Sequence, residues 1–119
     1  MSEHIAYIVE DDPHLQKIFT EAVRKAGYTA EGCSSGEVFL ECATKVPPDL
    51  VVLDLHLPGI SGDDVLHRIR SSSHMQNTIV ILATADPLFA DVFRDEADFV
   101  MIKPVSFGQL RDLAARLSK

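Results

Sequence analysis

Short apolar runs alternate along the chain with longer segments in which apolar residues recur at helical spacing. The runs predict β-strands over residues 5–9, 28–33, 50–54, 78–83 and 99–102. The periodic segments predict helices that follow these strands and begin at Pro13, at Ser34 or Ser35, near Ser61, at Pro87 and at Ser106. Strands and helices that alternate in this way form βαβ units, so the pattern predicts an α/β fold with a parallel sheet.

Residues that interrupt regular structure fall between the periodic segments. Gly27 follows the first helix, Pro47 and Pro48 follow the second, and the serines at 71–73 are expected to form a loop after the third. Each helix should turn one apolar face toward the sheet. The residues expected on these faces are Leu15, Ile18, Phe19, Ala22, Val23, Ala26, Val38, Phe39, Cys42, Val46, Val65, Leu66, Ile69, Leu88, Phe89, Val92, Phe93, Phe107, Leu110, Leu113, Ala114 and Leu117.

The composition is typical of one folded domain, which we expect to cover residues 1–119. A net charge of −7, without a cluster of Lys and Arg, argues against direct binding to nucleic acid. No apolar run approaches the ~20 residues that span a bilayer, and the N-terminus lacks a signal-peptide pattern, so we expect a cytoplasmic protein without a membrane segment. Cys33 and Cys42 are expected to be free thiols.

Polar side chains follow four of the five predicted strands. The first strand leads into Glu10 and Asp11, the third ends in Asp54, the fourth leads into Thr84 and the fifth into Lys103. The carboxyl ends of parallel strands meet at one edge of the sheet, and ligands bind there at the point where the strand order reverses. We therefore expect these side chains to share one pocket.

The chemistry of this set suits phosphate and a hard cation. Mg²⁺ prefers carboxylate oxygens together with a phosphate, and Asp11 and Asp54 could supply the carboxylates. A carboxylate can attack a phosphoryl group to give an aspartyl phosphate, while Lys103 and the Thr84 hydroxyl stabilise its oxygens. Alone, each residue has an ordinary structural role as a turn residue, a helix cap or a surface lysine before a Pro104 that could follow a cis peptide. Together they indicate an active site.

This set of residues resembles that of the receiver (REC) domain of bacterial two-component response regulators, in the CheY-like superfamily. The resemblance extends over residues 5–117 and implies a doubly wound, flavodoxin-like (βα)5 fold of three layers with strand order 2-1-3-4-5. It also implies that Asp54 accepts a phosphoryl group from a phosphohistidine of a sensor histidine kinase or a histidine phosphotransfer protein. The motifs VEDD, LDLHLPGISG, ATAD and IKP carry the resemblance, and they contain Glu10, Asp11, Asp54, Thr84 and Lys103.

The same resemblance implies a metal site and a mode of signalling. Mg²⁺ would be bound by Asp11, Asp54 and the backbone carbonyl of His56, and by Glu10 through a water molecule. Phosphorylation would draw Thr84 inward and change the surface that binds a downstream protein. The chain would be a signalling phosphoacceptor that catalyses only its own phosphorylation and dephosphorylation, and not an enzyme in the usual sense.

Two features depart from the family pattern. Receiver domains usually have Tyr or Phe three residues before the lysine, where this chain has Val100, and Phe99 should point to the opposite face. Thr84 and Lys103 also lie closer together in the sequence than is usual, which shortens the region of the fourth helix. We therefore expect an altered output surface, and a monomer or a weak homodimer.

Other functions remain open at this point. A phosphatase of the haloacid dehalogenase type would need a second Asp two residues after the nucleophile, where this chain has His56. A pseudo-receiver, which binds partners without control by phosphorylation, would be favoured by loss of Asp54, Asp11 or Lys103, and all three are present. The five histidines lack the close spacing of a transition-metal site. The chain is either a free-standing regulator or part of a longer protein.

Overall fold

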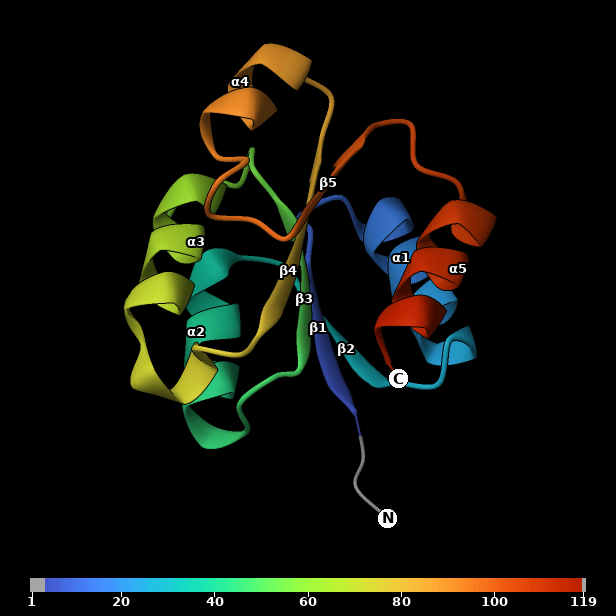
Figure 1. Cartoon of the computed structure of the whole chain (residues 1–119), viewed down its shortest axis with the longest axis horizontal. Coiled ribbons are helices and arrows are strands. Elements are labelled where there is room, and N and C mark those ends of the chain that lie inside the picture. The colour runs from blue at the N-terminus through green and yellow to red at the C-terminus, as the bar shows by residue number, and fades with distance from the viewer. Residues whose placement is uncertain (1–3, 119) are drawn as a thin grey trace.

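The computed structural model describes residues 4–118, in which strands and helices alternate as the sequence predicts (Figure 1). The expected strand boundaries agree with the observed ones to within one residue. The elements are β1 (Ile5–Val9), α1 (Pro13–Lys25), β2 (Thr29–Cys33), α2 (Gly36–Lys45), β3 (Leu50–Asp54), α3 (Gly62–Ser71), the 3₁₀ helix η1 (Ser73–Met75), β4 (Ile79–Thr84), α4 (Pro87–Val92), β5 (Phe99–Ile102) and α5 (Phe107–Leu117).

The strands within residues 4–118 form one parallel sheet in the order β2-β1-β3-β4-β5. Helices α1 and α5 cover one face of the sheet, and α2 and α3 cover the other (Figure 1). Helix α4 lies beyond α3, at the carboxyl end of the strands (Figure 1). This arrangement confirms the predicted doubly wound, flavodoxin-like fold of three layers.

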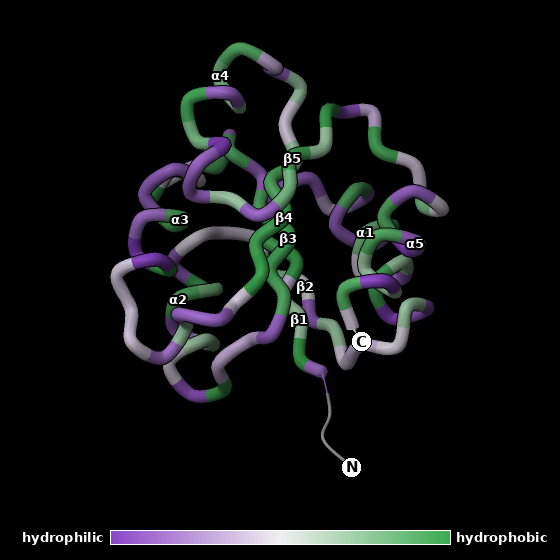
Figure 2. The backbone as a smooth tube through the Cα atoms, in the orientation of Figure 1, coloured by the Kyte–Doolittle hydropathy of each residue, from purple (hydrophilic) through white to green (hydrophobic). Residues whose placement is uncertain are grey.

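Side chains of the sheet alternate between two hydrophobic cores, one on each face. In β1, Tyr7 and Val9 face α2 and α3, whereas Ala6 and Ile8 face α1 and α5. Every residue of β3 is buried, as expected of a central strand that is covered on both faces. Figure 2 shows the resulting pattern, in which the central strands β1, β3 and β4 are mainly hydrophobic and the helices are mixed.

The α-helices begin at or next to the residues where the sequence predicts that they begin. N-cap side chains accept hydrogen bonds from backbone N–H groups in the first turn of each α-helix, and this satisfies donors that would otherwise lack a partner. The N-cap residues are Asp12, Ser35, Ser61, Asp86 and Ser106.

In the described part of the chain, none of the helices is both long and apolar enough to cross a membrane.

Helix α2 differs from the sequence prediction in the side chains that face inward. Phe39 is buried as expected and Ala43 is buried with it, but Val38 and Val46 are 46% and 47% exposed. Phe39 and Ala43 are four residues apart, so they lie one above the other on the helix, and Val38 falls beside this stripe. Val46 is the C-cap residue and has an extended conformation, so its side chain leaves the helical face.

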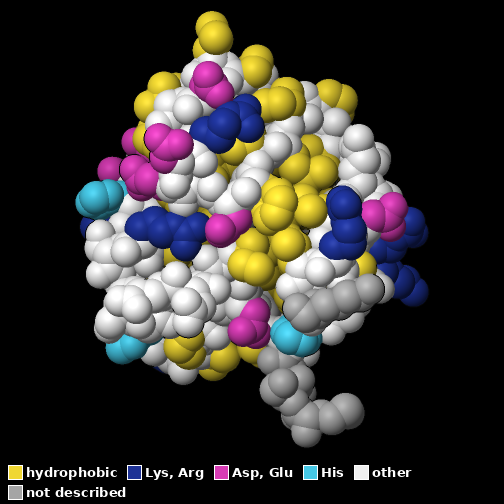
Figure 3. All heavy atoms as spheres, in the orientation of Figure 1, with side chains coloured by type: hydrophobic (Ala, Val, Ile, Leu, Met, Phe, Trp, Pro, Cys, Tyr) yellow, Lys and Arg dark blue, Asp and Glu magenta, His cyan; other side chains and the backbone are white. Residues whose placement is uncertain are grey.

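Helix α4 differs more strongly. Leu88 and Val92 were expected to face inward, but they are 83% and 74% exposed. Among the described residues of α4, Ala90 alone is buried. The helix lies at the rim of the sheet, where only a narrow face can contact the rest of the fold (Figure 1). Exposed hydrophobic side chains are therefore visible over α4 at the top of the molecule and over the edge strand β5 (Figure 3).

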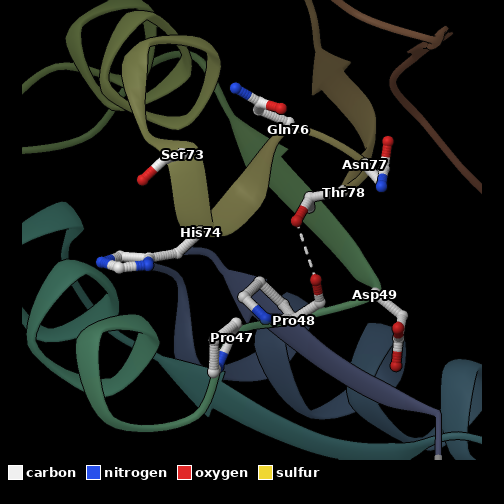
Figure 4. A pocket seen from close by; sticks show the side chains of 8 residues that line it. All are labelled: Pro47, Pro48, Asp49, Ser73, His74, Gln76, Asn77 and Thr78. Atoms are coloured by element: carbon white, nitrogen blue, oxygen red, sulfur yellow. Dashed lines mark hydrogen bonds between the residues drawn. The ribbon is translucent and has the colours of Figure 1, made fainter.

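The opposite, amino-terminal edge of the sheet carries a polar hollow of about 220 Å³ (Figure 4). The serines at 71–73 were predicted to form a loop, but α3 continues to Ser71 and η1 follows, held by the buried side chain of Met75. The Thr78 hydroxyl donates to the carbonyl oxygen of Pro48 at 2.7 Å and joins the start of β4 to the loop before β3 (Figure 4). The hollow is lined by Pro47, Pro48, Asp49, Ser73, His74, Gln76, Asn77 and Thr78.

Candidate active site

The candidate side chains lie at the carboxyl ends of four neighbouring strands. Glu10 and Asp11 follow β1, Asp54 and Thr84 are the last residues of β3 and β4, and Lys103 follows β5. Asp54 pairs in register with the residue before Thr84, and the Lys103 N–H donates to the Thr84 carbonyl oxygen at 2.8 Å. Sheet pairing thus places the predicted residues at one edge of the sheet.

Lys103 forms an ion pair with two carboxylates in the interior of this site. Its Nζ lies 2.8 Å from Glu10 Oε1 and 3.5 Å from Asp54 Oδ2, and the side chains of these acids are only 3% and 6% exposed. Burial raises the pKa of Glu10, and the hydrogen bond from Lys103 offsets only part of this effect. Burial lowers the pKa of Lys103, but its contacts with Glu10 and Asp54 outweigh burial and raise that pKa above its ordinary value. Lys103 is therefore positively charged at neutral pH.

Three carboxylates form a cluster beside this lysine. Glu10, Asp11 and Asp54 each have an oxygen within 4.8 Å of the others. Glu10 and Asp54 are buried, whereas Asp11 is exposed, so water can reach one side of the cluster. Oxygen donors of this kind, with room for several waters, fit the coordination that Mg²⁺ prefers. The cluster also places like charges close together, which a cation would stabilise.

The loop after β3 is held by a hydrogen bond to Asp54, the candidate phosphoacceptor. The backbone N–H of His56 donates to Asp54 Oδ1 at 3.1 Å, so one carboxylate oxygen is held by the loop while the other faces Lys103. Gly62 begins α3 so close to this loop that a Cβ atom would overlap the backbone of Asp54 and Leu55. Gly59 has a φ of 70°, a left-handed conformation that favours glycine, at the turn between them.

Thr84 is fully buried and connects the site to α4. Its Oγ1 accepts a hydrogen bond from the Asp86 N–H at 3.2 Å. Asp86 in turn caps α4, because its Oδ1 accepts from the N–H groups of Leu88 and Phe89 at 3.1 Å each. Among residues 4–118, the Thr84 hydroxyl accepts this hydrogen bond and donates none. The Lys103-Pro104 peptide is cis, as the sequence suggested.

The strand β5 has no aromatic ring at the position expected from the family pattern. Val100 is partly buried against the core on the side of α2 and α3. Phe99 pairs in register with Ile81, which belongs to the other core, so Phe99 points to the opposite face and is 39% exposed. The structure thus confirms the prediction that Phe99 and Val100 face opposite sides of the sheet. Val100 has no ring and the ring of Phe99 lies on the other face, so neither residue can supply an aromatic switch next to Thr84.

Sequence reasoning missed two contacts that support the site, one made by Gln16 and one made by the ring of His56. The Gln16 side chain donates from Nε2 to the carbonyl oxygen of Glu10 at 2.9 Å and so holds the loop that carries the acids. The His56 ring lies 5.4 Å from the Phe89 ring, between the β3–α3 loop and α4. Gln16 is a polar residue in the second turn of an amphipathic helix, which gives a weak signal. The contact between His56 and Phe89 has no local sequence signal, because it joins distant segments.

Comparison with known proteins assigns the family. The sequence pattern described as the response regulator receiver domain matches residues 6–115. The chain belongs to the response regulator receiver domain family. This assignment confirms the resemblance seen in the sequence, and as a receiver domain the chain is a signalling module rather than a metabolic enzyme.

Relatives of this receiver domain include full-length regulators and solved structures. It is 32% identical over 113 residues to the DNA-binding response regulator MtrA of Mycolicibacterium smegmatis, a match that covers 92% of this chain and 47% of MtrA. The chain thus spans about half the length of this curated relative. The chemotaxis protein CheY4 of Vibrio cholerae has the same fold, with a TM-score of 0.87, 20% identity, and coverage of 98% of this chain and 99% of CheY4. The response regulator TrrA of Thermotoga maritima, solved in complex with Mg²⁺-BeF, has a TM-score of 0.83, 29% identity, and coverage of 96% and 98%.

Proposed function

We propose that this receiver domain accepts a phosphoryl group on Asp54 from a phosphohistidine of a sensor histidine kinase or a histidine phosphotransfer protein. The observation that carries the proposal is the setting of Asp54, a 6% exposed carboxylate between Lys103 at 3.5 Å and an acidic cluster suited to a cation. Family membership and the convergence of Glu10, Asp11 and Thr84 on the same edge of the sheet support it. We further propose that residues 1–119 act as one domain in the cytoplasm.

In the transfer, a carboxylate oxygen of Asp54 forms a bond to phosphorus while the bond from phosphorus to the donor imidazole nitrogen breaks. The bonding electron pair leaves with that nitrogen. Lys103 Nζ, which already lies 3.5 Å from Asp54 Oδ2, would donate to a phosphoryl oxygen, and the Thr84 hydroxyl would donate to another. Both contacts would offset charge on the phosphoryl group as it arrives.

The acidic cluster would hold Mg²⁺ during this reaction. Asp11, Asp54 and the His56 carbonyl oxygen would bind it directly, and Glu10 would bind through water. When bound, the ion supplies positive charge that offsets the negative phosphoryl oxygens. The exposed side of Asp11 leaves space for the waters that Mg²⁺ retains.

The output would be a change in binding to a downstream protein. Thr84 is joined to α4 through Asp86, so a movement of the Thr84 hydroxyl toward a phosphoryl group would disturb the α4 cap. The exposed apolar side chains of α4 and β5 form a surface that such a change would alter (Figure 3).

We expect a monomer or a weak homodimer, and no direct contact with nucleic acid, in keeping with the net charge of −7.

Intact-mass spectrometry after incubation with acetyl phosphate tests the proposal. The protein should gain one phosphoryl group in the presence of Mg²⁺ and much less in its absence. The matched Asp54→Asn variant, which preserves the size of the side chain, should gain none. A fold check by circular dichroism should give the same spectrum for both proteins.

Two results would contradict the proposal. An adduct of equal yield in the Asp54→Asn variant would assign the acceptor to another residue. No adduct with any small donor or with a histidine phosphotransfer protein would favour the alternative of a pseudo-receiver, which binds its partners without control by phosphorylation.

A further inference from the structure

Three aromatic rings connect the loop after β3 to α4. The ring of His56 lies 5.4 Å from that of Phe89, at an interplanar angle of 37°. The ring of Phe89 lies 5.3 Å from that of Phe93, at 53°. Tilted aromatic pairs at such distances attract each other beyond the effect of the area they bury. His56, Phe89 and Phe93 therefore form a continuous aromatic ladder.

Helix α4 depends on few contacts for its position. It has six residues, too few to be stable alone, so its packing decides where it lies. Ala90 is buried and Phe93 packs against the core near α2 and α3, whereas Leu88 and Val92 point into solvent. The contact between Phe89 and His56 is thus a substantial part of what fixes the first turn of α4.

His56 takes part in the active site through its backbone. Its N–H donates to Asp54 Oδ1 at 3.1 Å, while its exposed side chain contacts the ring of Phe89. A second connection leads from the site to the same residue, because Thr84 Oγ1 accepts from the Asp86 N–H and Asp86 caps the N–H of Phe89. Both sets of contacts between the site and α4 therefore include Phe89.

We propose that Phe89 is a positioning residue for the His56 loop, and that the His56–Phe89 contact couples occupancy of the Asp54 site to the position of α4. The inference rests on the function proposed above. Coupling of this kind is reciprocal, so Phe89 influences binding at the site as much as the site influences α4.

Magnesium binding to the unphosphorylated protein measures one direction of the coupling. Isothermal titration calorimetry with Mg²⁺ alone should show that Phe89→Ala weakens binding roughly two- to tenfold, the effect expected from losing one aromatic pair that preorders the loop. Leu88→Ala is the matched control, since it removes an apolar side chain from the same turn of α4 that is 83% exposed. Leu88→Ala should leave the affinity for Mg²⁺ unchanged. Phe89→Tyr, which retains the ring, should bind Mg²⁺ as tightly as the unchanged protein.

A double-mutant cycle separates this role from a general loss of structure. His56→Ala preserves the backbone groups of His56 but removes its ring, so it should weaken Mg²⁺ binding as much as Phe89→Ala does. The double variant should bind no more weakly than either single variant, because both remove the same contact. Equal affinities of Phe89→Ala and the unchanged protein would refute the proposal, as would equal weakening by Leu88→Ala or additive effects in the double variant.

A fluorescent reporter measures the other direction. The chain contains no Trp, so Phe89→Trp places a single indole on α4. Addition of Mg²⁺ and beryllofluoride, a stable analogue of the phosphoryl group, should shift the emission of this variant, and the shift should be lost with Asp54→Asn. Formation of the adduct is followed independently by ¹⁹F NMR. An Asp54-dependent adduct without any change in emission would overturn this inference alone, whereas the absence of an Asp54-dependent adduct would overturn the proposed function.

Discussion

Replacement of Lys103 by Met tests the electrostatic account of the site. Met has a similar length and retains an apolar stem, but it removes the charge that lies 2.8 Å from Glu10 and 3.5 Å from Asp54. Both carboxylates are almost buried, so they would be left close together without this cation. The expected result is a large loss of stability at neutral pH when Mg²⁺ is absent.

The size of this loss follows from the burial of the ion pair. Removing one partner of a buried pair typically costs ~3–5 kcal/mol. Lys103 itself is 19% exposed and Asp11 opens the site to water, so we expect a value near the lower limit, about 3 kcal/mol at neutral pH. This is a large share of the ~5–15 kcal/mol that stabilises an ordinary domain.

The loss should depend on pH in a defined direction. Burial raises the pKa of Glu10 above its ordinary 4.5, and removal of Lys103 would raise that pKa further. Between the ordinary pKa of Glu10 and its raised pKa in the folded protein, the folded protein binds more protons than the unfolded chain. Its stability therefore increases as the pH falls through this range. The deficit of Lys103→Met should therefore shrink as the pH is lowered from neutral toward the ordinary pKa of Glu10.

Urea unfolding followed by far-ultraviolet circular dichroism, at several pH values, measures both effects. Lys17→Met is a suitable control, because Lys17 is an exposed lysine on α1. The control should change the free energy of unfolding by less than ~0.5 kcal/mol. A deficit for Lys103→Met no larger than that of the control, or one that stays constant across the pH range, would refute the reasoning.

Further predictions concern the metal, the packing and the thiols. Asp11→Asn should weaken Mg²⁺ binding about tenfold in calorimetry with little effect on stability, and unchanged affinity would remove Asp11 from the ligand set. Gly62→Ala should destabilise the fold by ~1–3 kcal/mol in urea unfolding, because its Cβ would overlap backbone, whereas Gly108→Ala, where a Cβ meets only ordinary contacts, should be neutral or stabilising. Burial raises the pKa of the Cys33 thiol from 9.0 to about 12, so the folded state retains a proton that the unfolded state loses, and stability should decline as the pH rises through this window. Cys33 should contribute about 1 kcal/mol of that decline by pH 10, and an equal pH dependence in Cys33→Ala would exclude this cause.

The place of the candidate active site at one edge of the sheet could be predicted because it depends only on the fold class. Once Asp54 and Lys103 are recognised at the ends of apolar strands, parallel pairing alone brings them to one edge of the sheet. The same holds for the cap at Ser106, which acts through backbone groups a few residues away. Signals that act locally, or through strand order, were therefore sufficient for most of the fold and for the candidate site.

The remainder depends on contacts between distant segments. Helical spacing shows which residues share a face, but it does not show how much of that face the sheet covers, which is why Leu88 and Val92 are exposed. The pairing of His56 with Phe89 depends on the path of the β3–α3 loop and the place of α4 at the rim. Neither can be deduced from the residues around them in the sequence.

Chemical mapping of the phosphorylated residue tests the central claim most directly. Borohydride reduces an acyl phosphate to an alcohol, so protein treated with acetyl phosphate and Mg²⁺, then with borohydride, should contain homoserine at position 54 when its peptides are sequenced by mass spectrometry. The account predicts this conversion at Asp54, with Asp11, Asp12 and Glu10 unchanged. Conversion at another carboxylate, with Asp54 intact, would contradict it.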